Sequence, residues 1–204
     1  MVLVSEKVNS KKENFSLNKK ELDYCVGLAR KSIEFSLKND SLLKYTDFEL
    51  LNFSKKLLEK KACFVTLQKN GELRGCIGHL VAIQPLYKDI IENAFNAAFS
   101  DPRFGALRKE ELLSISIEVS ILTDPVPLVF KDEKDLLSKI TPKKDGLIIN
   151  KGYYTATFLP SVWSEIKNKK IFLTQLCLKA GLDANEWKRP GLKVQIYHAI
   201  KAKE

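Results

Sequence analysis

The chain has 204 residues, 45% of them hydrophobic, which is enough to bury a full core without disulfides or a structural metal. No stretch reaches the roughly 20 apolar residues that cross a bilayer, and Met1–Val4 is too short for the core of a signal peptide. Membrane-spanning and small disulfide-rich classes are thereby excluded, and we expect a cytoplasmic protein.

The net charge of +9 suggests nucleic-acid binding, but only five of the 34 basic residues are arginines. Arginine makes the bidentate contacts with phosphates and bases, whereas lysines on solvated faces mainly confer solubility. Lysine doublets often lie next to acidic residues, as at Lys60–Lys61 and Lys143–Lys144. We interpret the charge as a solvated surface, and nucleic-acid binding stays open as an alternative that depends on net charge alone.

The first 18 residues are rich in Lys, Asn and Ser and lack an apolar period, so we expect a mobile lead-in before a single domain at residues 19–204. An amphipathic helix follows, because apolar residues recur at helical spacing until Asn39–Asp40. Cys25 lies on its apolar stripe, and Cys177 lies on that of a helix predicted for Phe172–Ala180. Both thiols are therefore predicted to be buried.

A β-hairpin is predicted for Ala62–Leu80. It turns at Asn70–Gly71, the strongest short signal for a two-residue hairpin loop. A ladder that continues regularly from this turn places Val65 opposite Cys76. Arg74, two residues before Cys76, is then on the same face of the sheet.

The rest of the chain alternates between helical and β-type patterns. The further elements expected are a helix over 84–98, a strand over 113–121, a short helix over 132–140, a second hairpin over 146–158 and a last strand over 192–200. Strands in hairpins with helices between them predict an α+β fold with a largely antiparallel sheet and flanking helices. If the chain forms two lobes, the second is expected to be drawn from about residues 128–190.

The strongest candidate for chemistry is the cysteine of the hexapeptide Leu73-Arg74-Gly75-Cys76-Ile77-Gly78. Gly75 and Gly78 allow backbone or a ligand to approach Cys76 closely, and glycines within a strand pattern usually mark such an approach or a bulge. Arg74 on the same face would favour the thiolate, and Cys76 would then react with alkylating agents before the other three thiols. The alternative is a packed strand residue, with Arg74 in a salt bridge elsewhere, because the sequence supplies no general base beside the thiol.

Four other residues are candidates for a functional site. Asp101 and Arg103 either clamp a ligand or stabilise their own turn. Glu118 is an acid or base if its polar strand face lines a cleft, and otherwise a solvated side chain. His79 follows Cys76 by three residues and so points to the opposite strand face.

The sequence indicates no metal or cofactor. Its four cysteines and two histidines have no zinc-binding spacing, so we expect reduced thiols and no structural metal. His198, on an apolar strand face, is expected to be a core histidine with its hydrogen bonds satisfied. No glycine-rich phosphate loop is present either.

The hexapeptide and Asp101–Phe104 resemble the hallmark of the AMMECR domain family, whose prokaryotic members are called AmmeMemoRadiSam system protein A. The similarity extends to Ile115–Leu122, Phe158–Pro160 and Leu176–Leu182. It implies a larger and a smaller lobe with a cleft between them near the hexapeptide. It implies no established reaction, but it does imply association with a Memo-like protein and a radical-SAM protein.

Two segments depart from the family pattern. Ser161 replaces the glutamine of a Leu-Pro-Gln-Val motif, and Tyr153–Thr157 replaces a basic, glycine-rich segment. Roles that depend on those side chains are therefore not carried over to this chain.

Three functions follow from these features. We favour a binding protein or accessory subunit of a Memo-like and radical-SAM system, in which Gly75, Gly78, Asp101 and Arg103 shape a recognition groove. The second is an enzyme that uses Cys76 as nucleophile or redox thiol, with Arg74 as its activator and Glu118 or Asp101 in proton transfer. The third is a nucleic-acid-associated protein.

Overall fold

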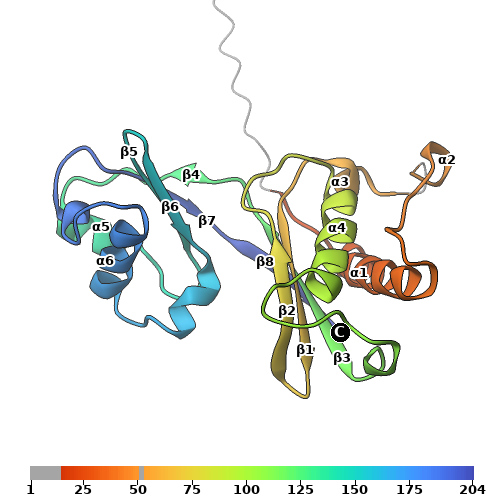
Figure 1. The fold of residues 1–204 in the computed structure, drawn as a ribbon. Coiled ribbons are helices and arrows are strands. Elements are labelled where there is room, and N and C mark those ends of the chain that lie inside the picture. The colour runs from red at the N-terminus through yellow and green to blue at the C-terminus, as the bar shows by residue number, and fades with distance from the viewer. Residues whose placement is uncertain (1–14, 51–52) are drawn as a thin grey trace, which may run out of the picture.

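The computed structural model describes residues 15–50 and 53–204, which form two antiparallel four-stranded sheets (Figure 1). The large sheet has the order β2-β1-β3-β8 and the small sheet the order β4-β7-β5-β6. The prediction of an α+β fold with antiparallel sheets is therefore confirmed. The lead-in expected at residues 1–18 falls mostly on residues 1–14, which lie outside the described residues.

The strands of the large sheet are β1 (Cys63–Lys69), β2 (Glu72–Gly78), β3 (Ile115–Leu122) and β8 (Ala199–Lys203). Those of the small sheet are β4 (Val126–Pro127), β5 (Gly146–Lys151), β6 (Tyr154–Phe158) and β7 (Lys193–Tyr197).

The helices are α1 (Lys19–Asn39), α2 (Asp47–Leu50), α3 (Lys55–Leu58), α4 (Leu86–Phe99), α5 (Glu133–Lys139) and α6 (Lys169–Lys179). Three short 3-10 helices are η1 (Lys109–Glu111), η2 (Pro160–Ser164) and η3 (Glu186–Lys188).

Helices cover one face of each sheet. α1 and α4 pack on the large sheet, and α5 and α6 lie beside the small sheet (Figure 1). α1 begins at a capping box of Asn18 and Glu21, and Asp40 ends it in the left-handed conformation. The small sheet with α5 and α6 is called the small lobe from here on, and in it Trp163 stacks on Phe172 with ring centroids 3.7 Å apart. Each sheet therefore has its own hydrophobic core.

Two chain segments join the two sheets: residues 123–125 connect β3 to β4, and a second segment connects β7 to β8. β7 belongs to the small sheet and β8 to the large sheet, and only His198 separates them. The backbone N–H of His198 donates to Thr123 Oγ1, and its carbonyl accepts from the N–H of Thr123. Its Nε2 lies 3.0 Å from Oδ1 of the buried Asp145. The side chain of His198 is 43% exposed, so the prediction of a core histidine is wrong, although its Nε2 is paired with Asp145.

The first hairpin turns where the sequence predicts. Asn70 and Gly71 have positive φ angles of 54° and 83°, and Lys69 pairs with Glu72 beside them. Both turn residues of a two-residue hairpin loop need positive φ, which Asn and Gly accept most readily. The predicted hairpin is therefore confirmed.

The register beyond this turn differs from the prediction that Val65 faces Cys76. A β-bulge leaves Arg74 without a partner, and Thr66 instead of Val65 lies opposite Cys76. A shift of one residue moves a side chain to the other face of a sheet. Val65 is buried under the helices, whereas Cys76 lies with Thr66 on the face that carries no helix. The predicted common face of Val65, Arg74 and Cys76 is therefore wrong.

The two glycines of the hexapeptide lie against neighbouring protein atoms. A Cβ atom at Gly75 would collide with the backbone carbonyl of Ala97 in α4. A Cβ atom at Gly78 would collide with the ring of Phe64 and the carbonyl of Cys63. The close approach predicted at these glycines is therefore made by other atoms of the protein, mainly backbone carbonyls.

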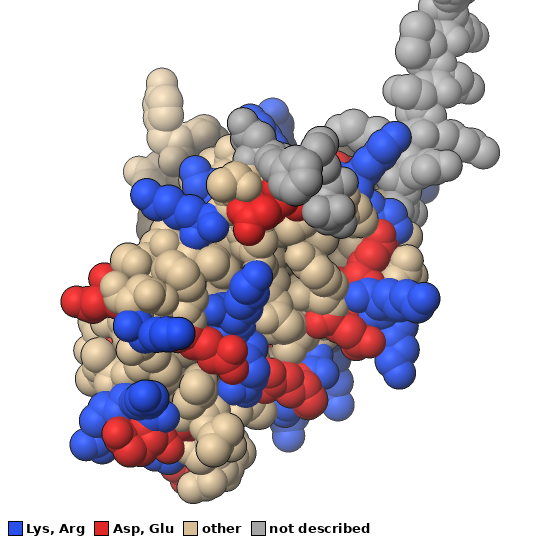
Figure 2. Space-filling model, turned by 90° about the vertical axis from the view of Figure 1, so that its right-hand side faces the viewer, with Lys and Arg blue, Asp and Glu red and all other residues tan. Residues whose placement is uncertain are grey.

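Charged side chains are mixed on the face seen in Figure 2, where lysines and arginines alternate with aspartates and glutamates. This distribution fits a solvated surface better than a continuous basic patch. Within the described residues, no helix combines the length and the apolar content needed to cross a membrane.

The substitution Gly75→Ala is expected to destabilise the fold by about 1–3 kcal/mol, the usual cost of overpacking. The obstructing atom belongs to the backbone of α4 and cannot rotate away. Gly27→Ala is the matched control, because a Cβ atom there meets nothing within 4 Å, and the change should stabilise α1 by up to about 1 kcal/mol. Urea unfolding measures both variants, and an undiminished stability of Gly75→Ala would contradict the close packing.

Candidate functional site at the open face of the large sheet

The open face of the large sheet is the face opposite α1 and α4. It carries Thr66, Cys76, Glu118, Ser120 and Lys201. Thr66 pairs with Cys76 on one side and with Glu118 on the other, so these three side chains form a row across β2, β1 and β3. Neighbouring strands are about 4.8 Å apart, which separates the backbones of Cys76 and Glu118 by about 10 Å.

A small cavity lies between the open face and the small lobe. Its volume is about 70 Å³, and Leu159, Pro160 and Ser161 at the start of η2 form its other wall. Cys76 and Glu118, both predicted as site residues, therefore line one cavity. Ser161, the position that departs from the family motif, lines it as well.

The thiol of Cys76 shares a hydrogen bond of 3.2 Å with the hydroxyl of Thr66. Cys76 is partly exposed, whereas Cys25, Cys63 and Cys177 are buried. Burial raises the pKa of Cys25 to about 12 and that of Cys63 well above its ordinary value. Cys76 is thus the accessible thiol among the four. Within the described residues, no acidic or basic side chain forms a hydrogen bond with the thiol of Cys76.

Glu118 is held by its neighbours. Its Oε1 lies 2.9 Å from Nζ of Lys201 and accepts a hydrogen bond of 3.2 Å from Ser120. This ion pair lies on a partly exposed surface, so the carboxylate is available to a ligand only in competition with Lys201.

Arg74 does not activate Cys76. Its guanidinium is bonded to Glu111, with contacts of 3.2 Å and 3.1 Å, and Lys69 binds the same carboxylate at 2.9 Å. Lys69 and Thr66 are three residues apart on β1, and strand residues separated by an odd number point to opposite faces. Lys69 is therefore on the helix side of the sheet. The β-bulge has therefore turned Arg74 away from the open face, and its predicted role as activator of the thiol is wrong.

The ion-pair partners of Glu111 lower its pKa from 4.5 to about 2. The hydrogen bond from Arg74 has the largest effect, followed by the backbone N–H of Arg108 and the side chain of Lys69. Glu111 itself is buried at the edge of the core. This cluster anchors the bulge to η1.

Asp101 and Arg103 bind the backbone of Cys76. Oδ2 of Asp101 accepts the N–H of Cys76 at 2.9 Å, and Nη2 of Arg103 donates to the carbonyl of Cys76 at 3.3 Å. The two side chains also pair with each other at 2.7 Å. The bonds from Arg103, and then those from backbone amides, hold the pKa of the Asp101 carboxyl well below its usual range. Arg103 is therefore the cation in contact with Cys76, through the backbone carbonyl of that residue.

Sequence reasoning missed a buried polar network behind the hairpin. Asp89 in α4 is fully buried, and its carboxylate accepts bonds from the N–H of Cys63, from Asn93 and from Gln84. Nδ1 of His79 lies 2.6 Å from its Oδ1. His79 thus turns toward α4 and away from Cys76, as the strand alternation predicts. Two polar residues four apart on the buried stripe of α4, Asp89 and Asn93, were the available signal.

Alkylation of the folded protein is expected to modify Cys76 before the three buried thiols. Arg74→Gln should leave the rate within about twofold, because Arg74 lies on the opposite face and does not stabilise the thiolate. Timed labelling with iodoacetamide followed by peptide mapping gives the rates. Labelling of Cys25, Cys63 or Cys177 at the same rate as Cys76 would contradict the burial pattern, and a tenfold slower reaction in Arg74→Gln would restore the activator role.

Glu111→Gln is expected to lower the free energy of unfolding at pH 7 by about 1–3 kcal/mol, the range for hydrogen bonds to a charged group. A carboxyl with a lowered pKa stabilises the fold above its unfolded pKa and loses this contribution as pH falls from about 4.5 to about 2. The variant should therefore lose less stability than the wild type over that range. Urea unfolding at a series of pH values tests this, and parallel curves would contradict it.

Comparison with known proteins identifies the family. The AMMECR1 family model matches residues 26–202. A protein of Saccharolobus islandicus strain L.S.2.15 is 38% identical over 188 residues, which cover 89% of this chain and 80% of that protein. A protein of Methanothermobacter thermautotrophicus is 37% identical over 179 residues, which cover 85% and 91% of the two chains.

The fold matches a solved structure. The crystal structure of the uncharacterised protein PH0010 from Pyrococcus horikoshii superimposes with a TM-score of 0.78 at 34% sequence identity. The match covers 93% of this chain and 94% of that one. Since the family model and these relatives span most of the chain, the protein belongs to the AMMECR1 family.

Proposed function

We propose that this chain is a binding protein whose recognition surface is the open face of the large sheet together with Leu159–Ser161. The observation that supports this proposal is the environment of Cys76. Its thiol is accessible and hydrogen-bonded to a neutral hydroxyl, with no base in contact among the described residues. The open face therefore offers hydrogen-bonding groups to a partner more readily than it offers an activated nucleophile.

A thiol enzyme is the less favoured alternative. A nucleophilic cysteine needs a base or cation that stabilises the thiolate. Glu118 is two strands away and bonded to Lys201, and His79 is bonded to Asp89 on the helix side. The charged side chains bonded to Cys76 in the described part of the chain are Asp101 and Arg103, and both bind its backbone and not its thiol.

The chemistry of the surface indicates what it recognises. Thr66, Ser120 and the pair Glu118–Lys201 present hydroxyls and two opposite charges, and Leu159 and Pro160 add an apolar edge. A cavity of about 70 Å³ holds one side chain or a few water molecules, which is too small for a cofactor. The surface therefore suits the insertion of a polar side chain from a protein partner.

The partner that we propose is a Memo-like protein or a radical-SAM protein, because the family resemblance implies association with both. In that arrangement the partner performs the reaction and this chain is an accessory subunit. Nucleic-acid binding has less support, since the face in Figure 2 mixes both charges. Non-specific binding through lysines would also weaken steeply with salt.

Binding to a purified Memo-like protein tests the proposal. Ser120→Phe fills the cavity and should weaken the association at least tenfold, whereas the same change at Ser41, an exposed residue after α1, should have no effect. Isothermal titration calorimetry measures both, and thermal unfolding shows that the variants remain folded. Equal affinity of the two variants would place the interface elsewhere.

The variant Cys76→Ser separates the binding protein from the thiol enzyme. A serine retains the hydrogen bond with Thr66, so the affinity for the partner should change by less than about threefold. An activity of the assembled system that disappears in Cys76→Ser, at unchanged affinity, would favour the thiol enzyme instead.

A further inference from the structure

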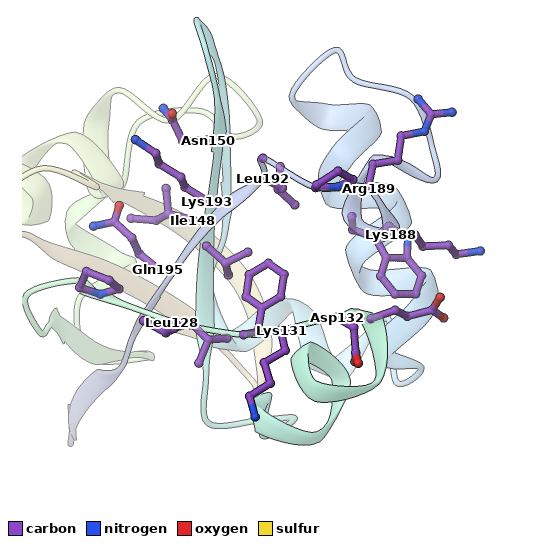
Figure 3. Close-up of a pocket in the computed structure, with 18 of the residues that line it drawn as sticks. Leu128, Lys131, Asp132, Ile148, Asn150, Lys188, Arg189, Leu192, Lys193 and Gln195 are labelled. Carbon is purple, nitrogen blue, oxygen red and sulfur yellow. The ribbon is translucent and has the colours of Figure 1, made fainter.

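The large cavity of the molecule is not at Cys76. A groove of about 870 Å³ lies in the small lobe between two segments of the chain. One is Pro127–Glu133, which begins at the end of β4, and the other is Trp187–Gln195, which includes the start of β7. Figure 3 shows side chains from both segments around β7, with Leu192 near the centre and Lys188 and Arg189 on the far side from Asn150. Its volume is within the range of about 300–1,000 Å³ that is typical of small-molecule sites.

The topology explains why this groove is open. β4 pairs with β7 over only two residues, Val126 with Ile196 and Pro127 with Gln195. The N–H of Leu128 still donates to the carbonyl of Val194, and the chain then diverges from β7 toward α5. Among residues 15–50 and 53–204, no other element fills the space between the two diverging segments, and this space is the groove.

The inner part of the groove is apolar. The buried ring of Trp187 forms part of its wall. Its other apolar lining residues are Leu128, Phe130, Pro190, Leu192 and Val194. The indole N–H of Trp187 donates to Thr174 in α6, which fixes the ring in place. Apolar surface at this position favours the burial of a hydrocarbon or aromatic body.

The rim of the groove is positively charged. Its acidic side chains are occupied, because Asp132 caps α5 and Glu133 lies 4.0 Å from Lys170. In the part of the chain that the structure describes, the side chains of Lys131, Lys188 and Lys193 form no hydrogen bond or ion pair and are exposed. Arg189 is paired with Glu186 and Asp183. Lys131 and Lys188 therefore lie at the rim of the apolar groove, and the ammonium group of Lys188 lies 5.2 Å from the centre of the Trp187 ring. Lys193 is on the opposite face of β7 from Val194.

We propose that this groove binds a small organic anion, with its apolar body against Leu192 and Trp187 and its anionic head group near Lys131 and Lys188, while Lys193 adds positive charge from the edge strand β7. An added peptide strand fits less well, because β4 and Leu128 already occupy the edge of β7 as far as Val194. The lysines are long and flexible, so they can reach a head group that lies over the groove.

Calorimetric titration with three probes tests the proposal, each below its micellar concentration. Laurate combines the anionic head with an apolar body, dodecyltrimethylammonium has the same tail with a cation, and butyrate has the same head with little tail. Laurate is expected to bind with a stoichiometry of one and at least tenfold more tightly than either of the others. Equal binding of laurate and dodecyltrimethylammonium, or no saturable binding of laurate, overturns the proposal.

Two charge-matched triple variants locate the site. Lys131→Gln, Lys188→Gln and Lys193→Gln together should weaken laurate binding at least tenfold. Lys134→Gln, Lys144→Gln and Lys167→Gln remove the same charge from exposed positions of the small lobe outside the groove and should change the affinity less than twofold. Equal loss in both triples would mean that net charge attracts laurate, and the proposed site would be wrong.

A variant that fills the groove gives an independent readout. Val129 lines the groove and is 79% exposed, so a larger side chain can be accommodated there without entering the core. Val129→Trp should weaken laurate binding at least tenfold while the thermal unfolding transition is retained. Ser120→Phe, which fills the separate cavity beside Cys76, should leave laurate binding unchanged, and the opposite result for this pair would overturn the assignment.

Discussion

Arg74 is the extra residue of β2, and its insertion decides which side chains of the hexapeptide face the helices. After the bulge, Gly75 lies under the backbone of α4 and Cys76 emerges on the open face. Arg74 itself is anchored by Glu111, so the bulge is held by an ion pair at the edge of the core. In a regular ladder, Arg74 and Cys76 would both share the face of the buried Val65, so both side chains would point toward the helices.

Much of the fold follows from local sequence signals. The structure contains the elements predicted from local patterns, namely the Asn70–Gly71 turn, the alternating strand β3 and the apolar stripes of α1 and α4. These signals are local because hairpin turns and helical periodicity depend on residues close in sequence. The antiparallel character of the sheets follows from the same hairpins.

The register of the first hairpin could not be predicted in the same way. A two-residue turn fixes the pairs next to it, such as Lys69 with Glu72, but a bulge farther along depends on packing against α4. The predicted common face of Arg74 and Cys76 failed with the register. The groove of the small lobe was also invisible, because its walls come from segments about sixty residues apart that carry no motif.

The clamp of Asp101 and Arg103 on Cys76 has a consequence for the behaviour of the protein in concentrated solution. β2 is an edge strand, and an uncovered edge is a template for pairing with the strand of another molecule. Here a carboxylate and a guanidinium occupy the outward N–H and carbonyl of Cys76, where a neighbouring strand would bond. Two side chains of a single turn thereby protect the middle of the strand from edge-to-edge aggregation.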